Sequence, residues 1–347
     1  MKLLVCALET SSNIHLEALK KELGDDIEFI GIFDKRLGTP TYDISSLAVM
    51  GFVDAIKKVR FFFKLLNEMV ALAKDADKIL LMDSSAFNLP LAKKLKKKYP
   101  NKEIIYYILP QAWAWRKKRI PKIEKYCDVL CSILPFEKDF YTKKEKISYV
   151  GHPLLDEIKL FKENVSHTNK VAFMPGSRKG EISKLMPIYK ELSKNIDKEA
   201  VLIIPAHFTQ EYIDEVYGDI SDFTIVKDAH RGLYEADFAF VCSGTATLEA
   251  VLIGTPIVLS YIAKPVDYYI AKNLLKVKYI GLANIFFDKM EKSELHKELI
   301  QDQVTVENLL NEYNTTDANR FFEHAKILRE YLNHGSSKTV AKIIYKQ

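Results

Sequence analysis

Residues 171–180 combine the residue types that hold an anion at the end of a strand. An apolar run, VAFMP, leads directly into Gly176, Ser177, Arg178 and Lys179, and a helix is expected immediately afterwards. Glycine lets backbone N–H groups approach a ligand, a helix start carries partial positive charge, and an arginine offers two parallel hydrogen bonds to a phosphate. The stretch is a candidate phosphate site; the alternative is an ordinary strand-to-helix turn with a solvated arginine.

A second turn of this kind follows the apolar run DFAFVC. Ser243, Gly244 and Thr245 end that run, and Glu249 lies about one turn into the small-residue helix expected next. The Gly244 and Thr245 amides could face a diphosphate while Glu249 accepts hydrogen bonds from a ribose diol; the alternative is a capped helix with Glu249 in solvent. Neither turn has the GxGxxG or Walker spacing, which disfavours dinucleotide-dependent hydride transfer and P-loop NTPase activity.

One carboxylate in the first half of the chain has a comparable position. Asp83 ends the apolar run KILLMD, and Ser84, Ser85, Phe87 and Asn88 follow it at the start of a predicted helix. A carboxylate there could remove a proton from an acceptor hydroxyl, or it could simply cap the helix.

Two stretches join aromatic and basic side chains. Residues 106–119 contain both tryptophans, Trp113 and Trp115, followed by four basic residues; no basic stripe continues elsewhere, so nucleic-acid binding is disfavoured. Residues 50–72 form an amphipathic, aromatic and basic pattern that suits an anionic lipid surface or, alternatively, an ordinary packed helix. The residues expected at the membrane or the acyl chains are Phe52, Val53, Ile56, Val59, Phe62, Phe63 and Leu66.

The elements that must position these residues follow from hydrophobic patterning. Of the 347 residues 48% are hydrophobic, and the net charge is a mild +5 that fits contact with phosphates or an anionic membrane. Continuous apolar runs separated by amphipathic stretches predict parallel strands covered on both faces by helices. These runs are 2–8, 27–33, 78–83, 103–109, 129–134, 147–150, 171–175, 200–205, 223–226, 237–242 and 256–261.

We therefore expect an α/β protein with two Rossmann-like, doubly wound domains facing a central cleft at the carboxyl ends of their strands. The predicted parts are a domain at 1–155 that carries Asp83 and the possible lipid-facing stretch, a polar linker at 156–170, a domain at 171–317 that carries the two candidate phosphate turns, and a helical segment at 318–347 that packs back on the domains. All four cysteines lie in apolar runs, which predicts buried, reduced thiols, a cytoplasmic protein and no metal site. No segment is long and apolar enough to span a bilayer.

Taken together, these stretches closely resemble the lipid-A-disaccharide synthase family over nearly the whole chain. The matching segments are LAVMGFVD (47–54), MDSSAFN (82–88), PQAWAWRKKR (110–119), LPFEKDFY (134–141), VGHPL (150–154), MPGSR (174–178), SGTATLEA (243–250) and KELIQ (297–301). The resemblance implies a GT-B type fold and inverting transfer from UDP-2,3-diacylglucosamine to 2,3-diacylglucosamine 1-phosphate, giving a β-1,6-linked disaccharide phosphate and UDP. It implies a cytoplasmic enzyme on the inner face of the inner membrane, without a cofactor, and it allows a homodimer.

The resemblance also assigns residues to the two substrates. Asp83 would be the general base and Arg178 would meet the charge that grows on the leaving phosphate. The UDP side comprises Gly176, Ser177, Arg178, Lys179, Ser243, Gly244, Thr245, Glu249, Asn284 and Gln301. The acceptor side comprises Glu9, Ser11, His15, Asn88, Trp115, Arg116 and His152, among which Glu9, His15 and His152 are alternative bases.

This chain departs from the family pattern in two loops. Where the family has Gly-Glu and then Ser-Gly-Asp, residues 8–13 read LETSSN, which lacks both glycines and the Asp. The family's Pro-Asp-Phe-Asn is replaced by SAFN at 85–88, so Asp83 is the only acid of that loop. Other readings are a UDP-N-acetylglucosamine 2-epimerase, a peptidoglycan glycosyltransferase or a two-lobed binding protein; the aromatic and basic stretches disfavour the epimerase, and the absence of an export signal disfavours the binding protein.

Overall fold

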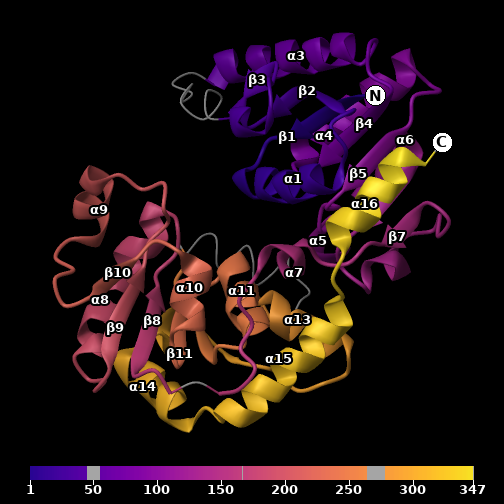
Figure 1. Ribbon diagram of the computed structural model, residues 1–347. Helices are drawn as coiled ribbons and strands as arrows, with labels where there is room; N and C mark the ends of the chain where they lie inside the picture. Colours follow the sequence, from indigo (N-terminus) through magenta and orange to yellow (C-terminus); the bar gives the residue numbers. More distant parts are fainter. Residues whose placement is uncertain (45–54, 166, 264–277, 347) are drawn as a thin grey trace. The chain divides into compact units, whose positions relative to one another are not determined.

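The computed structural model describes residues 1–347 apart from 45–54, 166, 264–277 and 347. It consists of two compact units, one formed by Met1–Glu157 with Leu332–Gln347 and the other by Ile158–Tyr331 (Figure 1). The polar stretch 156–170, expected to be a linker, ends helix α7 and then runs over the second unit, where Lys162 is buried, before entering strand β8 at Lys170.

Unit 1 contains a seven-stranded sheet in the order β3-β2-β1-β4-β5-β6-β7, with parallel pairing throughout. Its strands are β1 (Lys2–Ala7), β2 (Glu28–Phe33), β3 (Tyr42–Asp43), β4 (Lys78–Met82), β5 (Ile104–Tyr107), β6 (Val129–Ser132) and β7 (Ile147–Tyr149). Its helices are α1 (Thr10–Glu22), α3 (Ala55–Leu72), α4 (Ser85–Lys98), α5 (Ala112–Trp115), α6 (Ile120–Tyr126), α7 (Pro153–Glu157) and α16 (Ser336–Tyr345), with short 3-10 turns at Lys35–Leu37, Lys117–Arg119 and Glu137–Phe140.

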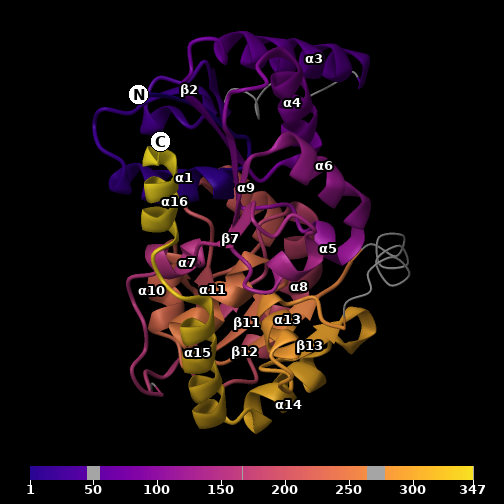
Figure 2. The same ribbon diagram turned by 90° about the vertical axis from the view of Figure 1, so that its right-hand side faces the viewer.

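Successive residues of the unit 1 strands point to opposite faces, and both faces are covered. In β1, Leu4 and Cys6 pack toward α3, α4 and α6, whereas Leu3 and Val5 pack toward α1 and α16. The C-terminal helix α16 thereby lies beside α1, although more than 300 residues separate them in the chain (Figure 2). Burial on both faces explains why the strands appear in the sequence as continuous apolar runs.

Unit 2 contains a six-stranded parallel sheet in the order β10-β9-β8-β11-β12-β13. Its strands are β8 (Lys170–Met174), β9 (Glu199–Ile203), β10 (Thr224–Val226), β11 (Phe238–Cys242), β12 (Ile257–Tyr261) and β13 (Lys297–Ile300). Its helices are α8 (Lys179–Ser193), α9 (Gln210–Tyr217), α10 (Ala229–Tyr234), α11 (Thr245–Ile253), α13 (Leu282–Lys289), α14 (Val306–Thr315) and α15 (Ala318–Leu332), with a 3-10 turn at Gln301–Gln303.

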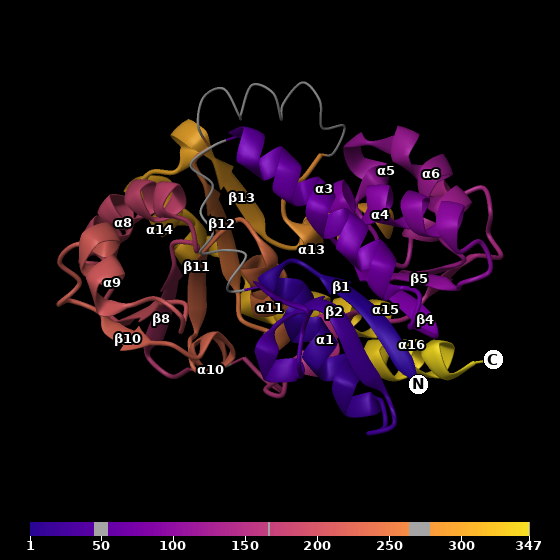
Figure 3. The same cartoon turned by 90° about the horizontal axis from the view of Figure 1, so that it is seen from above.

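Helices also cover both faces of this sheet. Side chains of α8, α9 and α14 form one core with alternate strand residues such as Phe173 and Phe240, whose rings stack 5.2 Å apart. Figure 3 shows these three helices along one face of the sheet. Helix α11 is apolar almost all round and packs against β11 and β12 on the other face, beside α10 and α13. The predicted α/β class with two parallel sheets is confirmed, and the four cysteines are buried free thiols as expected.

Two features of the described chain were not expected from the sequence. The edge strands β3 and β13 are short or polar and carry no apolar run. The C-terminal segment is divided: α15 belongs almost wholly to unit 2, and α16 belongs to unit 1. Among the described residues, no helix is both long enough and apolar enough to cross a membrane.

Candidate active site

The strand order of unit 2 places its two predicted anion-binding turns next to each other. Strands β8 and β11 are neighbours, with Met174 opposite Val241, and the chain leaves β8 toward β9 and β10 but leaves β11 toward β12 and β13. The loops that follow these two strands therefore run in opposite directions. Such a point of reversal leaves a crevice at the carboxyl ends of the strands, which is the usual ligand position in open α/β sheets.

The loop after β8 depends on Gly176. Its φ is +104°, and an added Cβ would lie 2.6 Å from Glu181 Oε2 and 3.2 Å from Cys242 Sγ. Any other residue would be strained in this conformation, and its Cβ would clash with the Glu181 carboxylate and crowd Cys242 at the end of β11. Gly176 thus brings the backbone of this loop close to the end of β11.

The cations of this loop have carboxylate partners. The Arg178 guanidinium donates to Glu181 Oε1 at 2.7 Å, and the Arg178 side chain is 80% exposed. This contact raises the pKa of Arg178 further above its ordinary value, so the side chain is charged at any working pH. Lys179 pairs with Glu215 on α9. Arg178 keeps most of its five N–H donors available to a ligand, and Ser177 beside it is exposed.

The loop after β11 presents an uncapped helix start. Gly244 has φ +156° with ψ −166°, a conformation that favours glycine, and the space where its Cβ would lie is open. No side chain caps α11, and its first turn contains no acid. Thr247 instead donates its hydroxyl back to the Gly244 carbonyl at 2.8 Å. The start of α11 at Gly244 and Thr245 therefore leaves backbone N–H donors without a side-chain cap, and their contact with a diphosphate stays a prediction.

Glu249 lies one turn further along α11 and is partly buried. Its Oε2 is 3.6 Å from Nε2 of His230, which is in the first turn of α10. The carboxylate is thus oriented from one side, and its second oxygen can accept hydrogen bonds from a diol.

The two remaining residues expected on the UDP side have structural contacts. Asn284 is fully buried, and its amide is used within the unit: it donates to the His296 carbonyl and to Glu298 Oε1, each at 2.8 Å, and accepts from Leu295 N and His296 N. The expectation of a direct contact with UDP is therefore wrong for this arrangement. Gln301 has φ +59° and accepts a hydrogen bond from Ala263 N at 2.8 Å, at the carboxyl end of the sheet.

Unit 1 has its own reversal point between β1 and β4, and Asp83 lies there. Strand β4 ends at Met82, and both Asp83 and Ser84 then adopt positive φ values of 46° and 36°. Each such residue costs about 1–3 kcal/mol and persists only where the surrounding structure imposes it, and such strain clusters at functional sites. Here Tyr106 Oη donates to the Asp83 carbonyl at 2.6 Å, and Asn88 Nδ2 donates to the carbonyls of Met82 and Asp83 at 2.9 and 3.0 Å.

These contacts change the role of Asn88. Its side chain is fully buried, so it is a positioning residue for Asp83 and does not line the acceptor site as expected. The Asp83 carboxyl is partly buried, and this desolvation, together with the negative charge of Glu9, raises its pKa above the ordinary value. A carboxylate with a raised pKa is better suited to accept a proton from a hydroxyl.

The altered loop at residues 8–13 supplies a second acid. Glu9 Oε1 accepts a hydrogen bond from the Ser84 hydroxyl at 2.9 Å, so this edge of the sheet carries two carboxylates although the loop after β4 has only one. The loop is held without the family's glycines by Asn13, whose Nδ2 donates to the carbonyls of Ala7 and Glu9, each at 2.8 Å. Ser11 follows on the exposed face of α1.

The two histidines proposed as alternative bases differ in their surroundings. Burial and the nearby His15 lower the pKa of His152 to about 3, so His152 is neutral and too weak a base for the role proposed for it. His15 pairs through Nδ1 with Glu157, and both side chains are nearly buried. Arg116 is exposed beside the 3-10 turn Lys117–Arg119, and the side chain of Trp115 lies outside the described residues.

Helix α3 bears only part of the predicted membrane face. Phe63 is 52% exposed, but Leu66 is fully buried in the core, so its assignment to the membrane was wrong. Phe62 is half-buried, with its ring edge-on to Phe87 at 5.3 Å. The other four residues cannot be placed on a face: Phe52 and Val53, and the side chains of Ile56 and Val59, lie outside the described residues.

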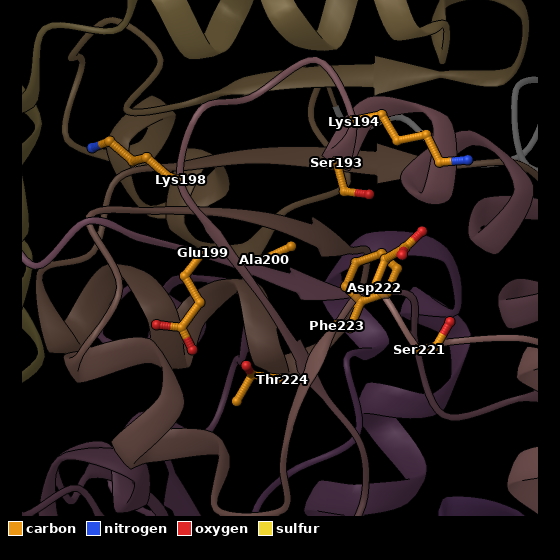
Figure 4. Close-up of a pocket in the computed structure, with 9 residues that line it drawn as sticks. All are labelled: Ser193, Lys194, Lys198, Glu199, Ala200, Ser221, Asp222, Phe223 and Thr224. Carbon is orange, nitrogen blue, oxygen red and sulfur yellow. The ribbon is translucent and has the colours of Figure 1, made fainter.

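A pocket of about 350 Å³ lies at the opposite end of the unit 2 sheet, where β9 and β10 begin (Figure 4). Lys194 and Lys198 line it, but their ammonium groups point away from each other, and Lys198 pairs with Asp237 at 2.8 Å. The pocket thus lacks the convergent donors found at the carboxyl ends of β8 and β11.

Comparison with known proteins agrees with the geometry. A family model described as lipid-A-disaccharide synthetase matches residues 3–342. The lipid-A-disaccharide synthase of Helicobacter pylori strain G27 is 50% identical over 352 residues, covering 98% of this chain and 96% of its own. The chain belongs to the lipid-A-disaccharide synthase family. The synthase of Campylobacter jejuni strain RM1221 is 48% identical over 363 residues, and this alignment covers 98% of each of the two chains.

The fold of this synthase family member is also found in more distant proteins. The crystal structure of Acinetobacter baumannii MurG matches all of this chain and 99% of its own, with a TM-score of 0.61 and 16% identity. At that identity the likeness concerns the fold alone, and it agrees with the expected GT-B type.

Sequence reasoning gave no role to three residues that organise the synthase's loops. Glu181 accepts hydrogen bonds from the Arg178 side chain and backbone. It stands three residues after Arg178, the N-cap residue of α8, and a glutamate at that position is a recognisable helix-start pattern. Asn13 and His230 carry no comparable signal, because their contacts join separate elements.

Asp83 carries a stability cost that can be measured in this synthase. Because its pKa is raised in the folded state, the stability that it contributes is lost as the pH rises through that pKa. Asp83→Asn should therefore raise the unfolding temperature at pH 7, and the gain should shrink as the pH falls toward the ordinary aspartate pKa of about 3.9. Asp77→Asn is the matched control: it replaces the charged acceptor of Lys2 N, at the other end of β4, by a neutral amide and should lower stability. A gain for Asp83→Asn that does not depend on pH would contradict this account.

Proposed function

We propose that the protein transfers 2,3-diacylglucosamine from UDP-2,3-diacylglucosamine to the 6-hydroxyl of 2,3-diacylglucosamine 1-phosphate, forming the β-1,6-linked disaccharide 1-phosphate and UDP. The observation that carries the proposal is about 50% identity along almost the full length of curated lipid-A-disaccharide synthases. As a member of that family the protein is a glycosyltransferase.

UDP binds in unit 2, at the reversal point between β8 and β11. As the bond between the anomeric carbon and the phosphate oxygen breaks, negative charge grows on the β-phosphate. Fixed donors that meet this charge stabilise the transition state. The candidates are the Arg178 guanidinium, the amides of Gly176 and Ser177, and the uncapped start of α11 at Gly244 and Thr245. Glu249, oriented by His230, accepts from the ribose hydroxyls.

The acceptor binds in unit 1, with its 6-hydroxyl at Asp83. Asp83 removes the hydroxyl proton, the oxygen attacks the anomeric carbon, and UDP leaves with the bonding electron pair from the opposite side. One displacement inverts the anomeric carbon, by the logic that applies to inverting glycosidases. The raised pKa of Asp83 and the strained backbone beneath it support this role. Glu9, hydrogen-bonded to Ser84, holds the edge of the same loop.

The activity is tested directly by incubating the purified chain with both proposed substrates in detergent. Formation of equal amounts of disaccharide 1-phosphate and UDP is the expected outcome. A chain that releases UDP without forming disaccharide would be a hydrolase or an epimerase-type enzyme, and the proposal would be wrong.

Loss of the base should affect turnover more than binding. A positioned general base contributes about 10²–10⁴ in rate, so Asp83→Asn should lower kcat by that factor and leave UDP affinity unchanged. Asp77→Asn, at the amino end of the same strand, should keep full turnover. Near-normal turnover of folded Asp83→Asn would transfer the role to Glu9 or His15.

The two proposed UDP contacts should fail in different ways. Arg178 faces charge that grows in the transition state, so Arg178→Ala should lower kcat by about 10²–10³. Glu249 faces the ribose in both states, and losing its charged hydrogen bonds should weaken UDP binding about ten- to a hundredfold by calorimetry. Arg231→Ala, which removes an exposed arginine paired with Glu235, serves as the control. Unchanged UDP affinity in Glu249→Ala would refute the ribose assignment.

We further propose that α3 brings unit 1 to the anionic membrane surface that holds both lipid substrates. Phe63 is exposed, Lys94 lies 5.8 Å from the centre of its ring, and Arg60 and Lys64 are exposed on the same helix. An aromatic side chain can enter the interface while the neighbouring cations remain at the headgroups. Each such cation contributes about 1 kcal/mol near an anionic surface.

Phe63→Ser should weaken cosedimentation with anionic vesicles about tenfold, because burying a phenylalanine side chain is worth about 1.5–3 kcal/mol. UDP affinity and unfolding temperature should not change, since Phe63 contributes little to the core. Ile225→Ser, at an exposed apolar residue of unit 2, is the control and should bind vesicles normally. Equal vesicle binding by the Phe63→Ser and wild-type proteins would rule out this helix as the docking element.

A further inference from the structure

We propose that Arg119 and Arg116 recognise the phosphate monoester of the acceptor at the first turn of α4. This inference rests on the proposed function, because it takes the acceptor to be a sugar 1-phosphate. It adds a binding site on unit 1 for the end of the acceptor that does not react.

The position of Arg119 is fixed by its contacts. It ends the 3-10 turn Lys117–Arg119, and its amide donates to the Arg116 carbonyl at 2.8 Å. Its Nη1 donates to the hydroxyl of Ser85, the first residue of α4. The guanidinium therefore contacts a residue, Ser85, that is only two positions after Asp83 in the chain. The preceding segment is anchored by Trp113, whose buried ring packs edge-on to Phe136 at 4.9 Å.

The charge around Arg119 is unbalanced. Burial and the neighbouring Arg116 both lower the pKa of Arg119, and within the described chain no carboxylate forms an ion pair with it. A partly desolvated guanidinium that also feels the positive charge of a neighbouring arginine is stabilised when an anion binds to it. A planar guanidinium matches the oxygens of a phosphate better than an ammonium group does.

The start of α4 adds backbone donors at the same place. The residue that would cap this helix, Ser84, donates its hydroxyl to Glu9 at 2.9 Å, and no side chain caps α4. The first turn contains no acid, Ala86 is exposed, and three lysines lie in the last turn. The guanidinium groups carry the proposal, and the helix start adds N–H donors to it.

The arrangement also matches the shape of the acceptor. A pyranose ring carries its 6-hydroxyl and its anomeric phosphate at opposite ends. With the hydroxyl at Asp83, the phosphate extends one sugar ring away, and Ser85 with Arg119 is the nearest cationic position along the same loop. A phosphate held there fixes which hydroxyl faces Asp83, so the site would determine the position of the new bond as well as affinity.

The test compares two acceptors, 2,3-diacylglucosamine 1-phosphate and the same lipid without its phosphate, in neutral detergent micelles. The wild-type kcat/KM should favour the phosphorylated acceptor about ten- to a hundredfold, the range expected for charge-assisted hydrogen bonds. Arg119→Ala should remove most of this preference by raising KM for the phosphorylated acceptor. It should leave turnover of the acceptor without phosphate unchanged. Arg119→Lys should recover part of it, and Lys122→Ala, on the next helical turn, should keep it all.

Binding without turnover is measured in parallel, by titrating wild-type protein and Arg119→Lys with glucosamine 1-phosphate and with glucosamine. Phosphate-dependent binding without any disaccharide formation would refute the proposed reaction but would still support a phosphate site at Arg119. Equal binding of both sugars by the wild type, or an undiminished phosphate preference in the folded Arg119 variants, would overturn the site. Should Arg119→Ala not fold, Arg119→Lys and the wild-type comparison give the answer.

Membrane headgroups carry the same phosphate chemistry and need their own measurement. Vesicles of phosphatidylglycerol and phosphatidylethanolamine should bind Arg119→Lys and wild type equally. Weaker vesicle binding by Arg119→Lys with an unchanged acceptor preference would identify the two arginines as a headgroup contact and overturn the acceptor assignment.

Discussion

Parallel pairing of β1 with β4 and of β8 with β11 is the constraint on which both sites depend. Parallel strands end at one edge of the sheet, and at each of these pairs the chain leaves in opposite directions. A loop that turns away on each side exposes backbone N–H groups and short side chains that a continuous connection would cover. Asp83 and Glu9 follow one pair, and Arg178 and Gly244 follow the other. Within each unit, the residues proposed for catalysis and binding therefore owe their positions to strand order.

The two edges differ in charge and in the way their strain is supported. Unit 2 uses glycine at Gly176 and Gly244, so its backbone reaches unusual conformations at little steric cost and offers amides to an anion. Unit 1 holds non-glycine residues, Asp83 and Ser84, in the left-handed region by hydrogen bonds from Tyr106 and Asn88. That support comes from elements that are themselves buried, so a change deep in the sheet would move the carboxylate.

Much of this arrangement could be predicted from the sequence. Strands buried on both faces must be apolar throughout, and each predicted apolar run corresponds to a strand. The predicted anion-binding turns can be recognised in the sequence because glycine and arginine have few other reasons to follow a strand together. Contacts between distant residues could not be predicted. Nothing in the sequence shows that the Asn284 amide is used internally, that His152 is buried or that Leu66 faces the core. The edge strand β13 was missed because KELI alternates charged and apolar residues over only four positions.

The division of the C-terminal segment affects the order in which the protein folds during synthesis. Unit 2 is one continuous stretch, Ile158–Tyr331, whereas unit 1 lacks α16 until the last residues of the chain have been made. Until then the apolar residues of α1 that meet α16, such as Leu16 and Leu19, have no cover from it. The first 157 residues of unit 1 are made before unit 2, yet unit 2 is the first to have all its parts, because α16 is made only after Tyr331.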